Sequence, residues 1–200
     1  LMAWEWMTPQ FDPRRCFQCP RAVAALRSPN PRVIAEEIWA KLLWAGLNLT
    51  QGDMPRSRTQ NTTRHPLELL RALSLVWLFA GLRRDEISRL RIGCIRWNST
   101  KKSNPKSESV CLLEVPANKT SGPYTKPVHR AVGEAIEEWQ QVRPKATLIP
   151  DEKSGELVDS LFMYRGRPVG KYIINRTIIP TLCKKAGVPE RDARGSITSH

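Results

Sequence analysis

The sequence predicts a mainly α-helical chain whose strands are confined to one stretch near its middle. Residues 67–80 are apolar on almost every side of a helix, and such a helix belongs at the centre of a domain. Short β-type runs cover 92–97 and 110–115, and the second leads into a turn signal at 121–123. Apolar residues also recur with helical spacing in three further stretches, 34–43, 132–139 and 174–182.

The central helix predicted at 67–80 has well-marked ends. Pro66 suits the first helical turn, where no backbone N–H is needed. Gly81 suits the stop, because glycine adopts the left-handed conformation without steric penalty. The helix contains Glu68 and Arg71 and is shorter than the roughly 20 apolar residues of a membrane span. We therefore expect a core helix and no membrane partner.

Three other helices complete the expected secondary structure. The first is expected from Pro31 to Gly46, where glycine would end it. An amphipathic helix is expected over 129–142. The last is expected over 170–186, and Pro180 inside it should kink or split it, since proline has no N–H to donate.

The chain is strongly basic, with 32 Lys and Arg against 19 Asp and Glu and a formal net charge of +13. An excess of this size indicates a polyanionic partner, most simply double-stranded DNA. A structural interaction domain with incidental basicity is the alternative from another class. Such a domain would lack affinity for DNA at moderate salt.

The first 30 residues are rich in proline and predict a linker or the tail of an upstream segment. Cys16 and Cys19 form half of a zinc site at best, so two free thiols are the default reading. The chain has five cysteines, an odd number and far below the cysteine density of small disulfide-bonded domains, so a reducing cytoplasm is expected. Because the chain starts at Leu1 and stops at His200 within a pattern, we expect it to be a piece of a longer protein.

A charged cluster follows the central helix directly, at residues 81–87, Gly-Leu-Arg-Arg-Asp-Glu-Ile. Spacing alone leaves two readings open: a solvated helix start, or a rigid turn whose guanidinium fork suits phosphate. The stretch, with Leu90 after it, resembles the first conserved box of the tyrosine recombinases, or phage integrases. That resemblance implies that Arg83 binds the scissile phosphate and that Glu86 is the acidic residue of the box.

Later segments resemble the same family in the same order. Lys119, followed by Thr and by Pro127 eight residues on, matches the hairpin lysine that donates a proton to the leaving 5′ oxygen. Residues 161–168 match its Leu-Phe, gap, Gly-x-Pro pattern. Thr-Ser-His at the end of the chain matches the opening of the second box, at the expected distance from Ala-Gly-Val at 186–188. His200 would then hydrogen-bond the phosphate or assist proton transfer.

The resemblance covers about residues 31–200 and implies the N-terminal part of an integrase catalytic domain. The implied fold is mainly α with a small antiparallel β-hairpin or sheet, incomplete at its C-terminus. The implied function is site-specific DNA recombination or integration through a 3′-phosphotyrosine, as in the integrases and transposases of mobile genetic elements. The nucleophilic tyrosine and the second arginine would follow residue 200.

No metal or other cofactor is required by this chemistry. The family implies a homo-oligomer, a tetrameric synapse, acting on DNA in the bacterial cytoplasm at the nucleoid. A type IB topoisomerase shares the chemistry, but the short spacing of the boxes is closer to an integrase. The alternative within DNA-binding proteins is a non-catalytic one that retains the recombinase fold. Further DNA contacts are expected from Arg84, Lys126, Arg165, Arg167, Lys171 and Arg176.

We expect this chain to bind duplex DNA mainly through phosphates. Each neutralised phosphate releases counterions, so affinity should fall steeply and linearly on a log–log plot against salt. Fluorescence anisotropy with a labelled duplex at several salt concentrations measures this slope. A flat salt response would contradict the prediction.

Overall fold

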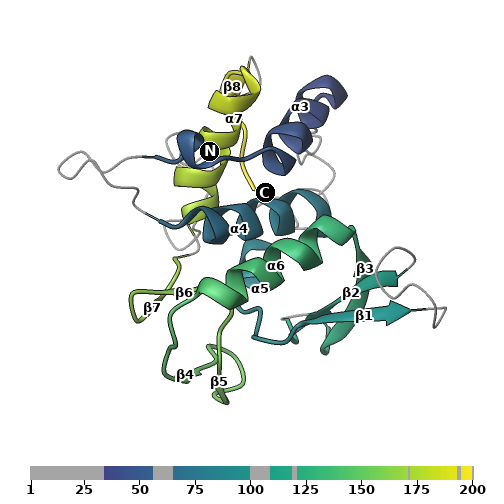
Figure 1. The fold of residues 1–200 in the computed structure, drawn as a ribbon, viewed down its shortest axis with the longest axis vertical. Coiled ribbons are helices and arrows are strands. Elements are labelled where there is room, and N and C mark those ends of the chain that lie inside the picture. Colours follow the sequence, from purple (N-terminus) through teal and green to yellow (C-terminus); the bar gives the residue numbers. More distant parts are fainter. Residues whose placement is uncertain are drawn as a thin grey trace, which may run out of the picture. The chain divides into compact units, whose positions relative to one another are not determined.

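The computed structural model describes residues 34–55, 65–99, 109–118, 121–170, 172–192 and 195–199. These residues combine helices with small antiparallel sheets, which agrees with the predicted fold class at that level (Figure 1). None of the described helices is long and apolar enough to cross a membrane. The predicted linker, with Cys16 and Cys19, lies outside the described residues, as do Lys119, Lys171 and His200.

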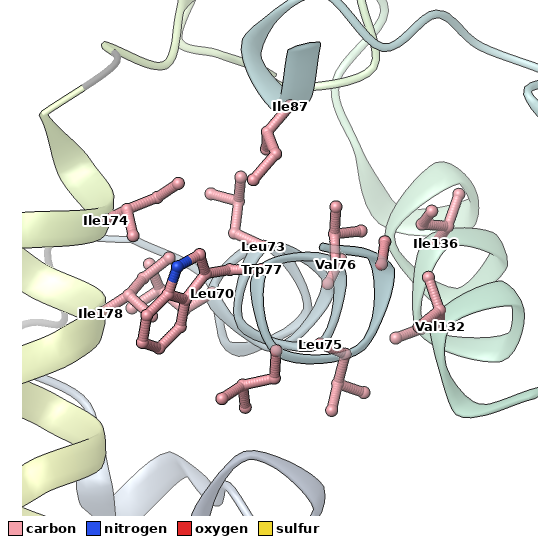
Figure 2. Close-up of a cluster of buried hydrophobic side chains, with 14 of the residues drawn as sticks. Leu70, Leu73, Leu75, Val76, Trp77, Ile87, Val132, Ile136, Ile174 and Ile178 are labelled. Atoms are coloured by element: carbon pink, nitrogen blue, oxygen red, sulfur yellow. The ribbon is translucent and has the colours of Figure 1, made fainter. Parts of the chain in front are cut away.

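Helix α4 (Leu67–Ala80) lies at the centre of the core, as predicted. It packs against α6 (Arg130–Val142) on one side and against η3 (Ile174–Ile178), a π-helix, on the other. Figure 2 shows the buried side chains that meet it from these two sides: Val132, Ile136, Ile174 and Ile178. Burial on nearly every side explains why its sequence is apolar almost without a break.

The ends of α4 fix where the chain goes next. Pro66 precedes the helix with an extended backbone (φ −62°, ψ 151°), one position earlier than expected. Gly81 ends it in the left-handed conformation, with φ 59°, as predicted. The buried Leu82 then anchors the turn into the short helix α5 (Arg84–Ser88).

The predicted stop at Gly46 is wrong. Helix α3 runs over Glu36–Leu47, so Gly46 lies inside it and is buried. A Cβ at this position would lie 2.4 Å from Cδ1 of Leu78 on α4. Gly46 therefore allows α3 to approach α4 closely, which spacing along one helix could not reveal. The expected helix start at Pro31 lies outside the described residues.

A three-stranded antiparallel sheet follows the predicted strand region, in the order β1 (Ile95–Ser99), β2 (Ser109–Val115) and β3 (Tyr124–Val128). Trp97 pairs with Cys111 in the register of β1 and β2. Alternate β2 side chains are buried and face the core: Cys111, Leu113 and Val115. The sheet packs on α6, and the predicted hairpin and the strand before it are both present.

Three two-stranded ladders occupy the second half of the described chain: β4–β5 (Ile149–Pro150, Leu157–Val158), β6–β7 (Met163–Tyr164, Arg167–Pro168) and β8–β9 (Arg191–Asp192, Gly195–Ser196). The β6–β7 turn contains Arg165 at φ 52° and Gly166 at φ 74°. A two-residue turn with both φ angles positive matches the twist of a hairpin.

The last predicted helix is split, as expected. The π-helix η3 passes directly into α7 (Ile179–Ala186), and Pro180 lies at the junction. Proline has no N–H for the carbonyl of Arg176, so a regular α-helical register cannot continue through it. The Thr181 hydroxyl donates to the Thr177 carbonyl at 2.7 Å and satisfies one carbonyl in this region.

Gly133→Ala on α6 should destabilise the fold although alanine is the better helix former. A Cβ at Gly133 would lie 2.6 Å from Cys111 Sγ and 2.7 Å from Trp97 Cζ2, so α6 and the sheet would have to separate. We expect a loss of about 1–3 kcal/mol in urea unfolding, the usual range for overpacking. Gly122→Ala is the control, because nothing lies within 4 Å of its Cβ position. Equal stability of both variants would contradict this reading.

Candidate functional site

Arg83 lies in the turn that connects α4 to α5. Its backbone is extended (φ −68°, ψ 150°) and it immediately precedes α5. Its side chain is exposed, whereas the preceding Leu82 is buried. No carboxylate of the described residues forms an ion pair with its guanidinium. The turn therefore presents an exposed cation on a rigid base.

The Glu86 carboxylate stabilises the turn that contains Arg83. It is only 5% exposed, and its Oε2 accepts the backbone N–H of Arg83 at 2.8 Å. Its Oε1 accepts the side-chain amide of Asn118 at 2.8 Å. The Tyr124 phenol lies near enough to this carboxylate for the charge of Glu86 to raise the pKa of the tyrosine. A buried carboxylate is stable when its lone pairs are used in this way.

Asn118 closes the turn that contains the predicted lysine. Its backbone N–H donates to the Ser121 carbonyl at 2.9 Å, and its Oδ1 accepts the Ser121 N–H at 2.8 Å. Lys119 and Thr120 lie between these residues and outside the described part of the chain. The two anchors of the lysine turn are therefore tied to Glu86, which also holds Arg83.

Tyr124 is held in its protonated form. Burial raises its pKa, and the charge of Glu86 raises it further, while the nearby Arg83 charge acts in the opposite direction. A phenol with a raised pKa is a poor nucleophile.

Lys126, expected to contact DNA, has a partner within the protein. Its half-buried ammonium donates to the carbonyl of Ala80 at 2.5 Å. Ala80 is the last residue of α4, and a cation at a helix C-terminus is stabilising. Lys126 therefore supports the turn that carries Arg83, and its DNA contact stays a prediction.

The remaining described arginines of the predicted DNA surface gather around two tyrosine rings. Arg84 and Arg176 lie 5.8 and 5.5 Å from the ring centroid of Tyr172. Arg165 lies 5.3 Å from the ring of Tyr164. A cavity of about 290 Å³ adjoins both rings and is lined in part by Arg167 and Arg176. The sequence predicted the arginines but not the rings that hold them.

A buried ion pair supports α5 from its far end. Arg89 is 7% and Asp151 6% exposed, and Arg89 donates from Nε and Nη2 to the carboxylate at 3.0 and 2.8 Å. Nη1 of Arg89 also donates to the carbonyl of Ala117, next to Asn118. Burial alone would raise the pKa of Asp151, but Arg89 and the N–H groups of Ser154 and Lys153 hold it well below its usual range. Sequence spacing gave no signal of this pair, whose members are 62 residues apart.

Ser199, the residue before His200, contacts η3. The Ser199 N–H donates to Asn175 Oδ1 at 3.1 Å, and Asn175 is adjacent to Arg176 on η3. Ile197 packs on the hydrophobic core. The approach to His200 is therefore anchored to the helix that carries Arg176, while the roles predicted for His200, Lys119 and Lys171 stay predictions.

No protein-family model matches this sequence, and no curated protein matches it either. Among solved structures, a crystal structure of XerA recombinase is similar, with a TM-score of 0.47 and 19% sequence identity. The match covers 88% of this chain and 49% of that chain, so this chain spans about half the length of that recombinase chain.

Asp151→Asn should cost about 3–5 kcal/mol at pH 7, because it leaves the Arg89 charge buried and unpaired. A carboxyl whose folded pKa is depressed contributes stability above its unfolded pKa, near 4, and loses it as pH falls toward the folded value. The gap between wild type and variant should therefore narrow by about 1 kcal/mol at pH 3.

Urea unfolding at the two pH values measures this gap. Glu134→Gln is the control, since Glu134 pairs with Arg130 on the exposed surface of α6 and its loss should cost less. A gap that stays constant between pH 7 and pH 3 would show that the Asp151 carboxylate is not the source of the stability.

Proposed function

We propose that this chain is part of a tyrosine recombinase, which cuts and rejoins DNA at a specific site through a 3′-phosphotyrosine intermediate. One observation carries the proposal. The buried Glu86 carboxylate joins the backbone of Arg83 to the side chain of Asn118, the residue before Lys119. Arg83 and the residue before Lys119 thus belong to one hydrogen-bonded unit.

Arg83 is proposed to bind the non-bridging oxygens of the scissile phosphate. Displacement at phosphorus passes through a five-coordinate arrangement with added negative charge, and preorganised donors stabilise it without further rearrangement. Guanidinium offers a planar pair of N–H donors that matches two phosphate oxygens. The Glu86 carboxylate accepts from the Arg83 backbone N–H and the Asn118 side chain, and it forms no ion pair with the Arg83 guanidinium among the described residues.

Lys119 and His200 are proposed to manage protons and hydrogen bonds at the same phosphate. A tyrosine hydroxyl would lose its proton, with the assistance of His200, as its oxygen bonds to phosphorus and the bond to the 5′ oxygen breaks, and Lys119 would give the 5′ oxygen a proton. Religation reverses these steps with the 5′-hydroxyl of the partner strand. His200 would hydrogen-bond the phosphate. The nucleophile is proposed to follow residue 200, because the tyrosine of the resembled family lies after its second box.

The setting of the reaction follows from the same proposal. Strand exchange needs two duplexes, and hence a homo-oligomeric synapse, for which the family implies four subunits. The strand exchange would take place on the bacterial nucleoid in the cytoplasm. The net charge of +13 supports a DNA partner but does not distinguish a recombinase from a non-catalytic relative. Substitution of Arg83 would distinguish them, because only a catalytic protein depends on this arginine for chemistry.

Arg83→Ala should abolish covalent protein–DNA adducts in the complete protein while leaving folding and DNA binding largely unchanged. The side chain is exposed and has no carboxylate partner among the described residues, so its loss leaves no buried group unsatisfied. Arg83→Lys should restore little, since a point charge replaces a two-pronged donor. A pool of nicked duplexes of randomised sequence, followed by a denaturing gel, detects the adduct.

Arg71→Ala is the control, because this arginine pairs with Glu138 on the surface of α4 and α6. Full adduct formation by Arg83→Ala would exclude the proposed role. Absence of any adduct from the wild-type protein that nevertheless binds DNA would favour the non-catalytic alternative.

A further inference from the structure

Tyr172 is more exposed than a residue leading into a core helix should be. It stands just before η3, yet 64% of the residue is exposed. Its neighbours are two guanidiniums, Arg84 from α5 and Arg176 from η3, at 5.8 and 5.5 Å from the ring centroid. The ring therefore joins cations that are far apart in the sequence.

The convergence of two positive charges on one exposed ring needs a physical reason. Like charges repel, and the attraction of each guanidinium for the face of the ring offsets part of that repulsion. Arg176 has no carboxylate partner within the described part of the chain. An anion bound beside the ring would give the Arg176 guanidinium a partner of opposite charge.

The space for such an anion adjoins the ring. The cavity of about 290 Å³ is bounded by Tyr164 and Tyr172, with Arg167 and Arg176 on its wall. Arg165 lies over Tyr164 at 5.3 Å, so each of the two rings supports at least one guanidinium. Cationic groups held in place on aromatic rings have lost much of their freedom before a ligand arrives, and they bind it at a lower entropic cost.

We infer that Tyr172 is the positioning residue of a second phosphate subsite, in which Arg167 and Arg176, on the wall of this cavity, bind a non-scissile phosphate of the DNA backbone. The inference rests on the proposed function, because Arg84, beside the same ring, directly follows Arg83 and so places this subsite beside the scissile phosphate. Guanidinium forks suit phosphate oxygens. The ring supports two cations, so its function is to hold them rather than to stack on a base. Such a contact sets the register of the duplex and carries no sequence information.

The test uses the 200-residue chain and a fluorescein-labelled duplex of random sequence, with anisotropy measured at several salt concentrations. Arg176→Ala should lower the log–log salt slope by about 1, the loss of one phosphate contact. Tyr172→Ala should weaken binding about three- to tenfold at low salt, because the Arg176 guanidinium loses its support. Tyr172→Phe should recover most of that loss, because phenylalanine keeps the ring face.

Arg130→Ala is the matched control. It also removes one exposed arginine, but this arginine pairs with Glu134 on α6, so the salt slope should stay that of the wild type. A duplex of a second, unrelated sequence should give the same losses for Tyr172→Ala and Arg176→Ala. Thermal unfolding of each variant checks that the fold is retained.

Two outcomes would overturn the inference while the proposed function stands. In the first, the wild type binds DNA with a steep salt slope and Arg176→Ala has the same slope. In the second, Tyr172→Phe is as weak as Tyr172→Ala, which would assign the effect to the hydroxyl and not to ring support. A wild-type chain that does not bind the duplex at all would instead overturn the proposed function, and this subsite with it.

Discussion

The burial of α4 on nearly every side is the constraint on which the rest of the described structure depends. Because α6 and η3 pack on it from two directions, α4 cannot rotate or slide without exposing apolar surface. Its end at Gly81 is therefore fixed in space, and so is the turn that follows. The exposed Arg83 is therefore held in position by the end of a buried helix.

Hydrogen bonds extend this rigidity from the core to the surface. Glu86 connects the Arg83 turn to the β2–β3 connection through Asn118, and Arg89 reaches the adjacent Ala117 carbonyl. Lys126 returns from β3 to the last carbonyl of α4. Three elements that are distant in the sequence thus hold one another at fixed separation. Removing one member leaves buried polar groups without partners, which costs more than a single hydrogen bond is worth.

Local patterns predicted the elements well, and contacts between elements poorly. The apolar run of α4, the stop at Gly81 and the split at Pro180 follow from properties of single residues and their spacing, and all three are present. Gly46 was misread because its partner, Leu78, is on another helix. In the site, the arginines and lysines were predicted from the sequence, whereas the contacts that hold them in place were not. A buried carboxylate such as Glu86 acquires its role only when the chain folds back on itself.

The turn between β6 and β7 has a consequence for how this sequence could change over time. Arg165 is the only residue other than glycine with a positive φ in the described part of the chain. Glycine or asparagine would occupy this conformation at a lower conformational cost. Selection for thermal stability alone would therefore tend to replace Arg165, and its presence marks a position where folding and another requirement are in conflict. Variants isolated purely for heat resistance should accumulate substitutions at this tip first.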